Sequence, residues 1–312
     1  MKTVIIGAGA MGSLFGGLLA LSGEDVWLVN IGKDHVDKIR SEGLTIEEGG
    51  KLQIIRVNAT TDVTSLGKAD FVLFFVKTYQ TKKAVLDSLV LQKESTIFLS
   101  LQNGLGNEEA ICKKVDRKKV ILGVTGQGAT YLGPGHIHHA GWGETQIGEL
   151  EGGMTDRVNQ IAQMFQKAGI STRVSSKIHD LIWEKLFVNV GINALTALTG
   201  LKNGQLLDYP ETVRLMEALV SEAVAVAKQK GVRIEGNPIK KVKNAAKATR
   251  ENRSSMGQDV DHRRRTEIDA INGAVVREAG RLGISVPFNQ AIMDLVKVIE
   301  KSFTNTNPFH KK

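Results

Sequence analysis

The sequence predicts an α/β fold: a doubly wound domain over residues 1–174, followed by an all-α domain over residues 175–312. Short runs rich in β-branched and aromatic residues alternate with helical stretches as far as Val174, a pattern typical of a parallel sheet covered by helices. After Val174 the strand pattern stops and long helix-like stretches follow. The length of 312 residues agrees, because it is that of about two domains.

The first element is a short strand, Thr3–Ile6, and a glycine motif follows it directly. A helical stretch from Ser13 to Ser22 and a second strand, Val26–Asn30, complete a βαβ unit. In such a unit the first glycine permits the tight turn, the second lets a pyrophosphate approach the backbone, and the third lets the helix pack on the sheet. The free N–H groups at the helix start attract phosphate. The arrangement predicts a Rossmann-type dinucleotide site formed by Gly7, Ala8, Gly9, Ala10, Met11 and Gly12.

The end of the second strand bears on the choice of cofactor. An acidic residue there binds the ribose hydroxyls of NAD, whereas a nearby arginine suits the 2′-phosphate of NADP. Asn30 occupies this position, and Lys33 and His35 follow within five residues. A basic neighbour in place of a carboxylate favours NADPH, while NADH stays open.

Three further apolar runs predict buried strands of a parallel sheet, at residues 71–76, 96–101 and 120–125. Ligands of such sheets bind beyond the carboxyl ends of the strands. Lys77 follows the first of these runs and Asn103 the second, so both are candidate binding residues. The turn-rich stretch from Gly133 to Gly148 predicts a hairpin.

Composition and charge exclude several classes of protein. With 42% hydrophobic and 24% charged residues, the chain is neither disordered nor collagen-like nor a coiled coil. The single cysteine, Cys112, excludes an intramolecular disulfide and fits a reducing compartment. The net charge of +8 lies mostly in residues 175–312, which carry 22 basic and 15 acidic side chains, and this excess suits an anionic ligand. Because no aromatic residues interleave with the basic clusters, nucleic-acid binding is not expected.

Two segments suggest a membrane anchor and a metal site, and neither interpretation holds. The uncharged run from Thr3 to Gly23 has the composition of a signal peptide or anchor, but five glycines interrupt it, so we expect a soluble, cytoplasmic protein. His136, His138 and His139 lie close together in sequence, but no cysteine completes a ligand set, so no metal site is expected.

The second half begins with a long apolar helix, predicted over residues 178–198. Lys185, Asn189 and Asn193 follow one another at intervals of four residues, which places them on one face of this helix. Buried polar side chains need partners. Two interpretations stay open: a structural network, or a slot for a polar substrate. Further helices are predicted at about 210–230, 237–252, 257–281 and 288–302, with a loop over residues 252–256.

A set of motifs spread along nearly the whole chain closely resembles the ketopantoate reductase (2-dehydropantoate 2-reductase) family. The motifs are G-A-G-A-M-G, V-K-T-Y-Q, Q-N-G-L-G, W-E-K-L-F-V-N-V-G-I-N-A-L-T-A, K-N-G-Q-L, E-N-R-S-S-M-G-Q-D, R-R-T-E-I-D-A-I-N-G and G-I-S-V-P. The Lys-Leu-x-x-Asn-x-x-x-Asn helix and the Ser-Ser-Met-x-Gln-Asp loop are far more specific than the glycine motif.

The resemblance implies roles for individual residues. Lys185 matches the catalytic proton donor of the family. The positions that match substrate contacts, or lie in the same loop as one, are Asn103, Asn189, Asn193, Asn203, Asn252 and Ser255. Besides the glycine motif, the positions that match cofactor contacts are Lys77, Asn103, Ala129 and Glu267. Asn30 departs from the pattern, because many members have arginine there.

The resemblance also implies a reaction: reduction of ketopantoate to (R)-pantoate by hydride transfer from NADPH, on the route to pantothenate and coenzyme A. The lysine ammonium would meet the charge that builds on the keto oxygen and supply its proton. Two competing hypotheses are a reductase of another small 2-oxo acid and a non-catalytic nicotinamide-sensing protein. A small-molecule substrate is the expected partner, and the long apolar helices are compatible with a homodimer.

Overall fold

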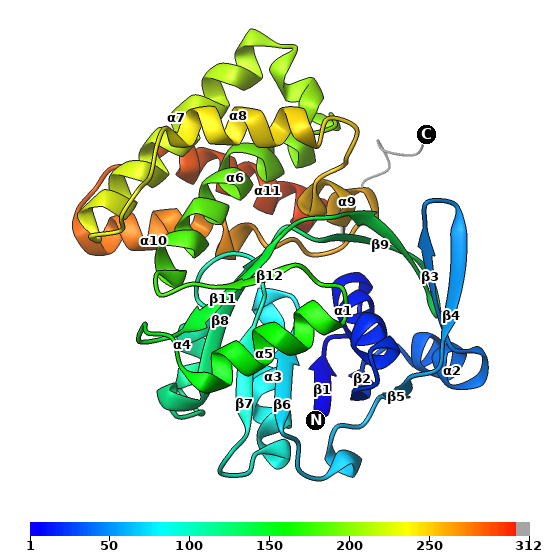
Figure 1. The fold of residues 1–312 in the computed structure, drawn as a ribbon. Helices are drawn as coiled ribbons and strands as arrows, with labels where there is room; N and C mark the ends of the chain where they lie inside the picture. The colour runs from blue at the N-terminus through cyan, green and yellow to red at the C-terminus, as the bar shows by residue number, and fades with distance from the viewer. Residues whose placement is uncertain (304–312) are drawn as a thin grey trace. The chain divides into compact units, whose positions relative to one another are not determined.

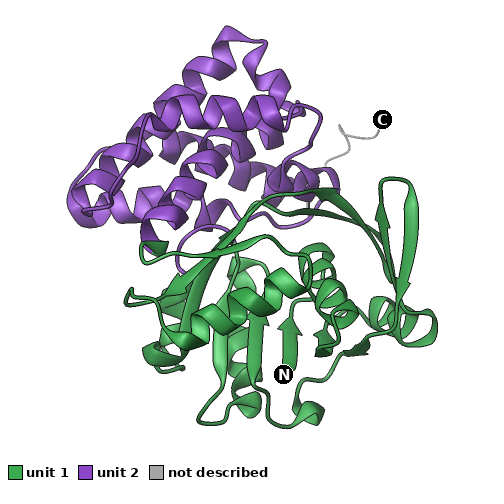
Figure 2. Ribbon diagram, in the orientation of Figure 1, with its two compact units in different colours: residues 1–102, 107–178 green, residues 103–106, 179–312 purple. Residues whose placement is uncertain are grey.

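The computed structural model describes residues 1–303, which form two compact units (Figure 2). Unit 1 comprises residues 1–102 and 107–178, and unit 2 comprises residues 103–106 and the chain from residue 179 onward. The short segment 103–106 belongs to unit 2 because Leu105 N donates a hydrogen bond of 2.9 Å to Ala270 O. Next to it, Gly104 has φ +75°, and a Cβ there would lie 2.4 Å from Ala270 O.

An eight-stranded sheet forms the centre of unit 1 (Figure 1). Its strands, in spatial order, are β12 (Thr172–Val174), β11 (Thr145–Glu149), β8 (Val120–Thr125), β7 (Ile97–Ser100), β6 (Phe71–Phe74), β1 (Lys2–Ile6), β2 (Asp25–Val29) and β5 (Asn58–Thr60). The six strands from β8 to β5 are parallel, and β11 pairs antiparallel with β8. The strand order reverses at β1, so the topological switch point lies where the glycine motif follows this strand.

Helices cover this sheet: α1 (Ala10–Leu21), α2 (Lys33–Glu42), α3 (Thr81–Ser88), α4 (Asn107–Cys112) and α5 (Asp156–Lys167). Short 3₁₀ turns span Thr64–Leu66, Thr78–Gln80, Leu89–Leu91 and Arg117–Lys119. Fully buried aromatic rings join the layers, because Phe165 of α5 packs edge-on against Phe15 of α1 at 5.6 Å and against Phe71 of β6 at 6.1 Å. Such rings bury large apolar areas and dominate core energetics.

A second, four-stranded sheet in unit 1 was not predicted. Its order is β4 (Lys51–Ile55), β3 (Leu44–Glu48), β10 (His136–Gly141) and β9 (Gly128–Gly133). The predicted hairpin is present as β9–β10, although it begins at Gly128 rather than Gly133. The β3–β4 hairpin turns at Gly49 and Gly50, both with positive φ, and β4 is exposed in four of its five residues, so its sequence lacks a buried-strand pattern.

Among its described residues, unit 2 contains helices joined by loops and no strand (Figure 1). Its helices are α6 (Ile178–Thr199), α7 (Pro210–Gln229), α8 (Pro238–Ala248), α9 (Ser255–Asp261), α10 (Asn272–Leu282) and α11 (Pro287–Ser302), with 3₁₀ turns at Gly204–Leu207 and Ile268–Ala270. Gly191 allows α6 to pack closely, since a Cβ there would lie 2.8 Å from Val242 of α8 and 2.9 Å from Val220 of α7. Among the described helices, only α6 is long and apolar enough to cross a membrane, and it is mostly buried, as a core helix is.

One predicted helix is wrong. The stretch from 257 to 281 is not continuous, because α9 ends at Asp261 and α10 begins at Asn272. Arg263 adopts φ +53° at the break, and Thr266 N donates a hydrogen bond of 2.6 Å to Glu300 of α11. The break places Glu267 directly before the 3₁₀ turn Ile268–Ala270. The predicted α/β fold with a helical second part is confirmed.

Candidate active site

The glycine turn after β1 has three glycines with three different environments. Gly7 has φ +94°, and a Cβ there would lie 2.5 Å from Val76 N, so the turn requires glycine. A Cβ on Gly12 would lie 2.4 Å from Gly7 O, so α1 could not approach the turn this closely with a larger residue. At Gly9, by contrast, apart from Gly9 itself and its neighbours in the chain, no heavy atom of the described residues lies within 4 Å of the Cβ position. The open side of Gly9 is where a ligand can approach the backbone.

The start of α1 suits an anion. Gly9 is its N-cap, no side chain caps the helix, and no acidic residue lies in the first turn. The first N–H groups of a helix have no partner inside it, and the helix dipole adds positive potential there. The half-buried Ala10 and Met11 carry no polar side chain that would compete. These residues therefore fit the pyrophosphate of a dinucleotide.

Asn30, which follows β2, is bound to the glycine turn itself. Its Nδ2 donates to Ala8 O at 2.6 Å, and its Oδ1 accepts from Gly32 N at 2.7 Å. Its amide therefore braces the turn and does not replace the carboxylate that holds a ribose in NAD enzymes. Lys33 and Asp34, both exposed, form the start of α2 a few residues further on.

Lys77 and Ala129, the other predicted cofactor contacts of unit 1, lie on different elements. Lys77 precedes the 3₁₀ turn Thr78–Gln80 and is half-buried. Ala129 lies in β9 of the small sheet, also half-buried, and not at the end of β8. Gln102, which begins the Q-N-G-L-G motif but was assigned no role from the sequence, holds the backbone next to Lys77. Its Nε2 donates to Val76 O at 2.8 Å and to Thr81 Oγ1 at 2.7 Å.

In unit 2, Lys185 lies on α6 together with Asn189 and Asn193, and the helix is continuous through all three. Burial lowers the pKa of Lys185 to about 8, and the Glu267 carboxylate acts in the opposite direction by raising it. Because that influence is coulombic, Glu267, itself buried, lies close to the ammonium. A lysine with this pKa is protonated at neutral pH and still gives up its proton readily.

Asn189 bears on the two interpretations of the polar face of α6. Its Nδ2 is buried and has no hydrogen-bond partner within residues 1–303. A buried amide donor without a partner costs about 1–3 kcal/mol, so a purely structural network does not account for it. The unpartnered Nδ2 favours the second interpretation, a donor for a ligand one helical turn from Lys185.

Three predicted site residues of unit 2 lie in or beside its loops: Asn203, Asn252 and Ser255. Asn203 is buried, its Nδ2 donates to Thr249 Oγ1 at 2.9 Å, and its backbone N–H donates to Asn252 O at 2.9 Å. The Asn252 side chain is exposed, so the structure uses this residue through its backbone. Ser254 caps α9 by accepting from Gly257 N at 3.0 Å, which leaves the half-buried Ser255 as the first residue of the helix.

Asn103 belongs to the same unit as Lys185. It begins the segment 103–106, which bonds to Ala270 through Leu105, and Ala270 closes the 3₁₀ turn that follows Glu267. Unit 2 therefore contains Lys185, Glu267, the asparagines of α6 and the Asn103 segment. The sequence pattern had placed Asn103 at the end of a strand of the first domain.

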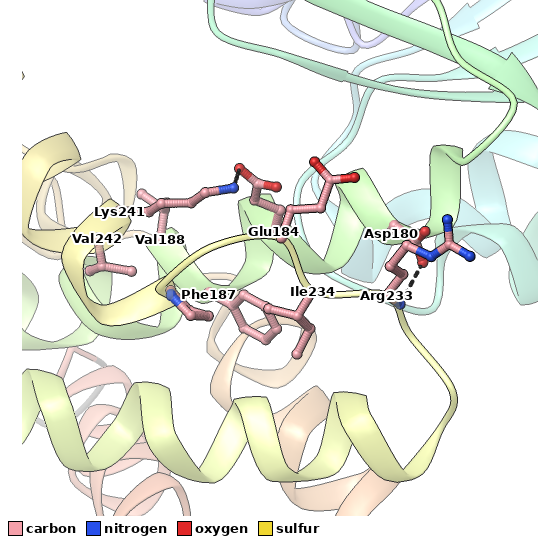
Figure 3. Close-up of a pocket in the computed structure, with 10 residues that line it drawn as sticks. Asp180, Glu184, Phe187, Val188, Arg233, Ile234, Lys241 and Val242 are labelled. Atoms are coloured by element: carbon pink, nitrogen blue, oxygen red, sulfur yellow. Dashed lines mark hydrogen bonds and ion pairs between the residues drawn. The ribbon is translucent and has the colours of Figure 1, made fainter.

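The pocket in Figure 3 is separate from these residues. It is a solvent-open hollow between the first half of α6, the loop before α8 and α8 itself. Two contacts organise its wall: Lys241 Nζ to Glu184 Oε1 at 2.7 Å, and Arg233 N to Asp180 Oδ1 at 3.1 Å. None of the predicted site residues lines it. Among the described residues there is also no group of three or more potential metal ligands.

Known protein-family models match both units of the chain. The model described as ketopantoate reductase PanE/ApbA matches residues 3–152, and its C-terminal counterpart matches residues 177–300. The chain belongs to the ketopantoate reductase family. A curated 2-dehydropantoate 2-reductase of Halobacterium salinarum is 37% identical over 302 residues, covering 96% of this chain and 99% of the relative. The protein of the same name from Pyrococcus horikoshii is also 37% identical, with 96% and 98% covered.

Two solved structures, of proteins with different names, share the fold of this chain. The PanE/ApbA family ketopantoate reductase from Ralstonia eutropha JMP134 is 33% identical, with a TM-score of 0.91 and 98% of this chain and all of that chain covered. A ternary structure of D-mandelate dehydrogenase with NADH and anilino(oxo)acetate is 29% identical, with a TM-score of 0.93 and 97% and 99% covered. One fold thus carries reductases with different substrates.

The predicted site residues of this chain fall into two local arrangements and a separate turn. The glycine turn in unit 1 and the Lys185 face in unit 2 each form a coherent local arrangement. Asn203 and Asn252 are tied to one another instead, in a turn beyond the end of α6. Gln102 and the buried Ser13 support the first arrangement through hydrogen bonds to nearby backbone oxygens, and the sequence offered no spacing signal for either.

Proposed function

We propose that this chain is a cytoplasmic, NADPH-dependent 2-dehydropantoate 2-reductase, which reduces ketopantoate to (R)-pantoate for pantothenate and coenzyme A synthesis. The observation that carries the proposal is Lys185: a half-buried lysine whose pKa is lowered to about 8, one helical turn from an asparagine Nδ2 that has no partner within residues 1–303. Relatives with this activity in their names align over nearly the full chain. A sensor protein would have no use for such a proton donor.

The proposed chemistry needs one acid and several donors. When bound, the reduced nicotinamide supplies the hydride that attacks the keto carbon. The Lys185 ammonium donates a hydrogen bond to the keto oxygen, stabilises the charge that builds there and transfers the Nζ proton to it. Asn189 and Asn193 donate to the carboxylate and hydroxyl of the substrate, with Asn103, Ser255, Asn203 and Asn252 as further contacts. Fixing both ends of the substrate orients the keto group toward the acid.

The proposed cofactor contacts are assigned residue by residue. The turn from Gly7 to Gly12 holds the pyrophosphate, while Lys77, Ala129, Asn103 and Glu267 contact other parts of the cofactor. Lys33 at the start of α2 pairs with the 2′-phosphate of NADPH, since the Asn30 amide is engaged with Ala8 and Gly32. A point charge at a helix N-terminus is a suitable phosphate partner.

The test of this proposal is nicotinamide oxidation with ketopantoate, followed by absorbance with NADPH and NADH in parallel. We expect kcat/KM to be at least tenfold higher with NADPH, and Lys33→Gln to raise the KM for NADPH several-fold while leaving that for NADH unchanged. Lys38→Gln is the matched control, because Lys38 is an exposed lysine of the same helix that pairs with Glu42. Absence of turnover with either cofactor would contradict the proposal.

One structural neighbour favours a second candidate. D-mandelate dehydrogenase acts on an aromatic 2-hydroxy acid by its name, and its ternary structure has a TM-score of 0.93. A substrate panel with ketopantoate, an aliphatic 2-oxo acid and the phenyl 2-oxo acid separates the two. Higher kcat/KM for the phenyl compound would transfer the proposal to an aromatic 2-oxo acid, with the same role for Lys185.

The pKa of Lys185 predicts a pH profile. Reduction requires the protonated amine, so kcat falls as pH rises through about 8. Glu267→Gln removes the charge that raises this pKa, so the alkaline limb shifts to lower pH when kcat is measured at saturating cofactor. Glu217→Gln, which alters a surface pair with Lys243, is the control and leaves the limb in place. An unshifted limb in Glu267→Gln would show that another group titrates.

A further inference from the structure

A buried chain of hydrogen bonds connects the small sheet of unit 1 to the glycine turn. Gly135, in the turn between β9 and β10, donates its N–H to His35 Nδ1 at 2.9 Å. His35 Nε2 lies 3.1 Å from Ser13 Oγ, and Ser13 Oγ lies 3.1 Å from Ala8 O. Ser13 and Ala8 are fully buried and His35 is 3% exposed, so water does not compete for these bonds.

The donor and the acceptor of each of these hydrogen bonds follow from the first bond, between Gly135 N–H and His35. A backbone N–H can only donate, so His35 Nδ1 accepts and carries no proton. The neutral ring then has its proton on Nε2, which donates to Ser13 Oγ. The hydroxyl, having accepted from the ring, donates to Ala8 O. Burial lowers the pKa of His35 below its usual value, in agreement with a neutral ring.

Ala8 O is the point where two independent supports meet. It accepts from Ser13 Oγ on α1 and from Asn30 Nδ2 after β2. Because the peptide unit is planar, holding this oxygen fixes the orientation of the peptide between Ala8 and Gly9. Gly9 is the residue with open space on its Cβ side and the N-cap of α1.

We propose that His35 is a positioning residue for cofactor binding. It acts through the Ser13 hydroxyl to hold the Ala8–Gly9 peptide, whose N–H is bonded to Gly7 O at 2.7 Å, and so sets the start of α1, where the pyrophosphate is proposed to bind. This inference rests on the proposed binding of a nicotinamide dinucleotide at the glycine turn. His35 does not touch the cofactor in this role. It transmits the position of the β9–β10 turn, through Gly135, to the turn after β1.

Two substitutions of His35 test its hydrogen bonds to Gly135 and to Ser13 separately. Asparagine places an amide oxygen near the position of Nδ1, so His35→Asn keeps an acceptor for Gly135 and loses the donor to Ser13. Glutamine places an amide nitrogen near the position of Nε2, so His35→Gln keeps the donor to Ser13. We expect His35→Asn to raise the dissociation constant of the reduced cofactor about tenfold, the effect of one ordinary hydrogen bond, and His35→Gln to stay within about threefold of wild type.

The readout is direct titration of nicotinamide fluorescence, together with steady-state kinetics. In His35→Asn the KM for the cofactor rises about tenfold, while kcat at saturating cofactor and the KM for the 2-oxo acid stay unchanged. Ser13→Ala shows the same split. Ser88→Ala is the matched control for Ser13→Ala: Ser88, at the end of α3, is also fully buried and its hydroxyl donates to a backbone oxygen, Val85 O, at 2.9 Å. Its loss leaves cofactor affinity unchanged.

Equal cofactor affinities of the Asn and Gln variants, or a loss confined to kcat, would overturn the role of His35. Thermal melting of each variant without cofactor checks that a general loss of folding does not produce the result. A wild-type protein that binds the cofactor but reduces no 2-oxo acid would contradict the proposed reaction, while the comparison of affinities would still decide the role of His35.

Discussion

Replacing Lys185 by alanine is expected to lower kcat by about 10²–10⁴-fold, the usual contribution of a general acid. The alanine variant has no group on this turn of α6 that can meet the charge on the keto oxygen or supply its proton. The affinity for the reduced cofactor should stay near that of wild type, because the proposed pyrophosphate contacts come from unit 1. Single-turnover absorbance and a fluorescence titration measure the two effects separately.

A charge-preserving variant sharpens this prediction. Lys185→Arg keeps a cation, but arginine stays protonated in proteins and is a poor proton donor. If proton transfer is the role of Lys185, the arginine variant stays nearly as slow as alanine; recovery of most activity would assign an electrostatic role instead. Lys202→Ala, which removes an exposed lysine paired with Glu251, is the control. Turnover of Lys185→Ala near the wild-type rate would refute the catalytic assignment.

Alanine at Gly9 is expected to abolish tight cofactor binding without harming the fold. Gly9 has φ −77°, a negative φ that residues with a Cβ adopt, and its Cβ position is open. The unfolding free energy should therefore change by less than about 0.5 kcal/mol. The added methyl group occupies the space proposed for the pyrophosphate, so we expect the dissociation constant of the cofactor to rise more than tenfold.

Gly12 provides the matched comparison. Alanine favours helices over glycine, yet a Cβ at Gly12 would lie 2.4 Å from the backbone oxygen of Gly7, so α1 must move. We expect Gly12→Ala to destabilise the protein by about 1–3 kcal/mol, the cost of overpacking. Chemical denaturation without cofactor measures the difference. Wild-type cofactor affinity in Gly9→Ala would place the pyrophosphate elsewhere.

The parts of the fold that the sequence predicted are those in which a local rule and a tertiary requirement agree. The strand before Gly7 and the helix after it follow from an apolar run, a glycine turn and an uncharged helical stretch. The polar face of α6 follows from four-residue spacing, which any helix of that length must respect. Both features depend on residues close together in the chain.

The features that were missed depend on contacts far along the chain. The pairing of β3 with β10 joins residues about ninety positions apart, and nothing in the exposed β4 strand indicates it. Asn30 appeared to mark cofactor choice, but its amide is bonded to Ala8 and Gly32, which only the structure shows. The break at Arg263 depends on an acceptor supplied by Glu300.

The segment from Asn103 to Gly106 has a consequence for how this protein can be divided. The chain enters unit 2 at residue 103, returns to unit 1 at residue 107 and enters unit 2 again at residue 179. A gene fragment that begins at residue 179 would therefore encode the helices without the four residues that bond to Ala270. The two units are not separable modules, and recombination between relatives at a single junction would leave the helical unit with another protein's version of this segment.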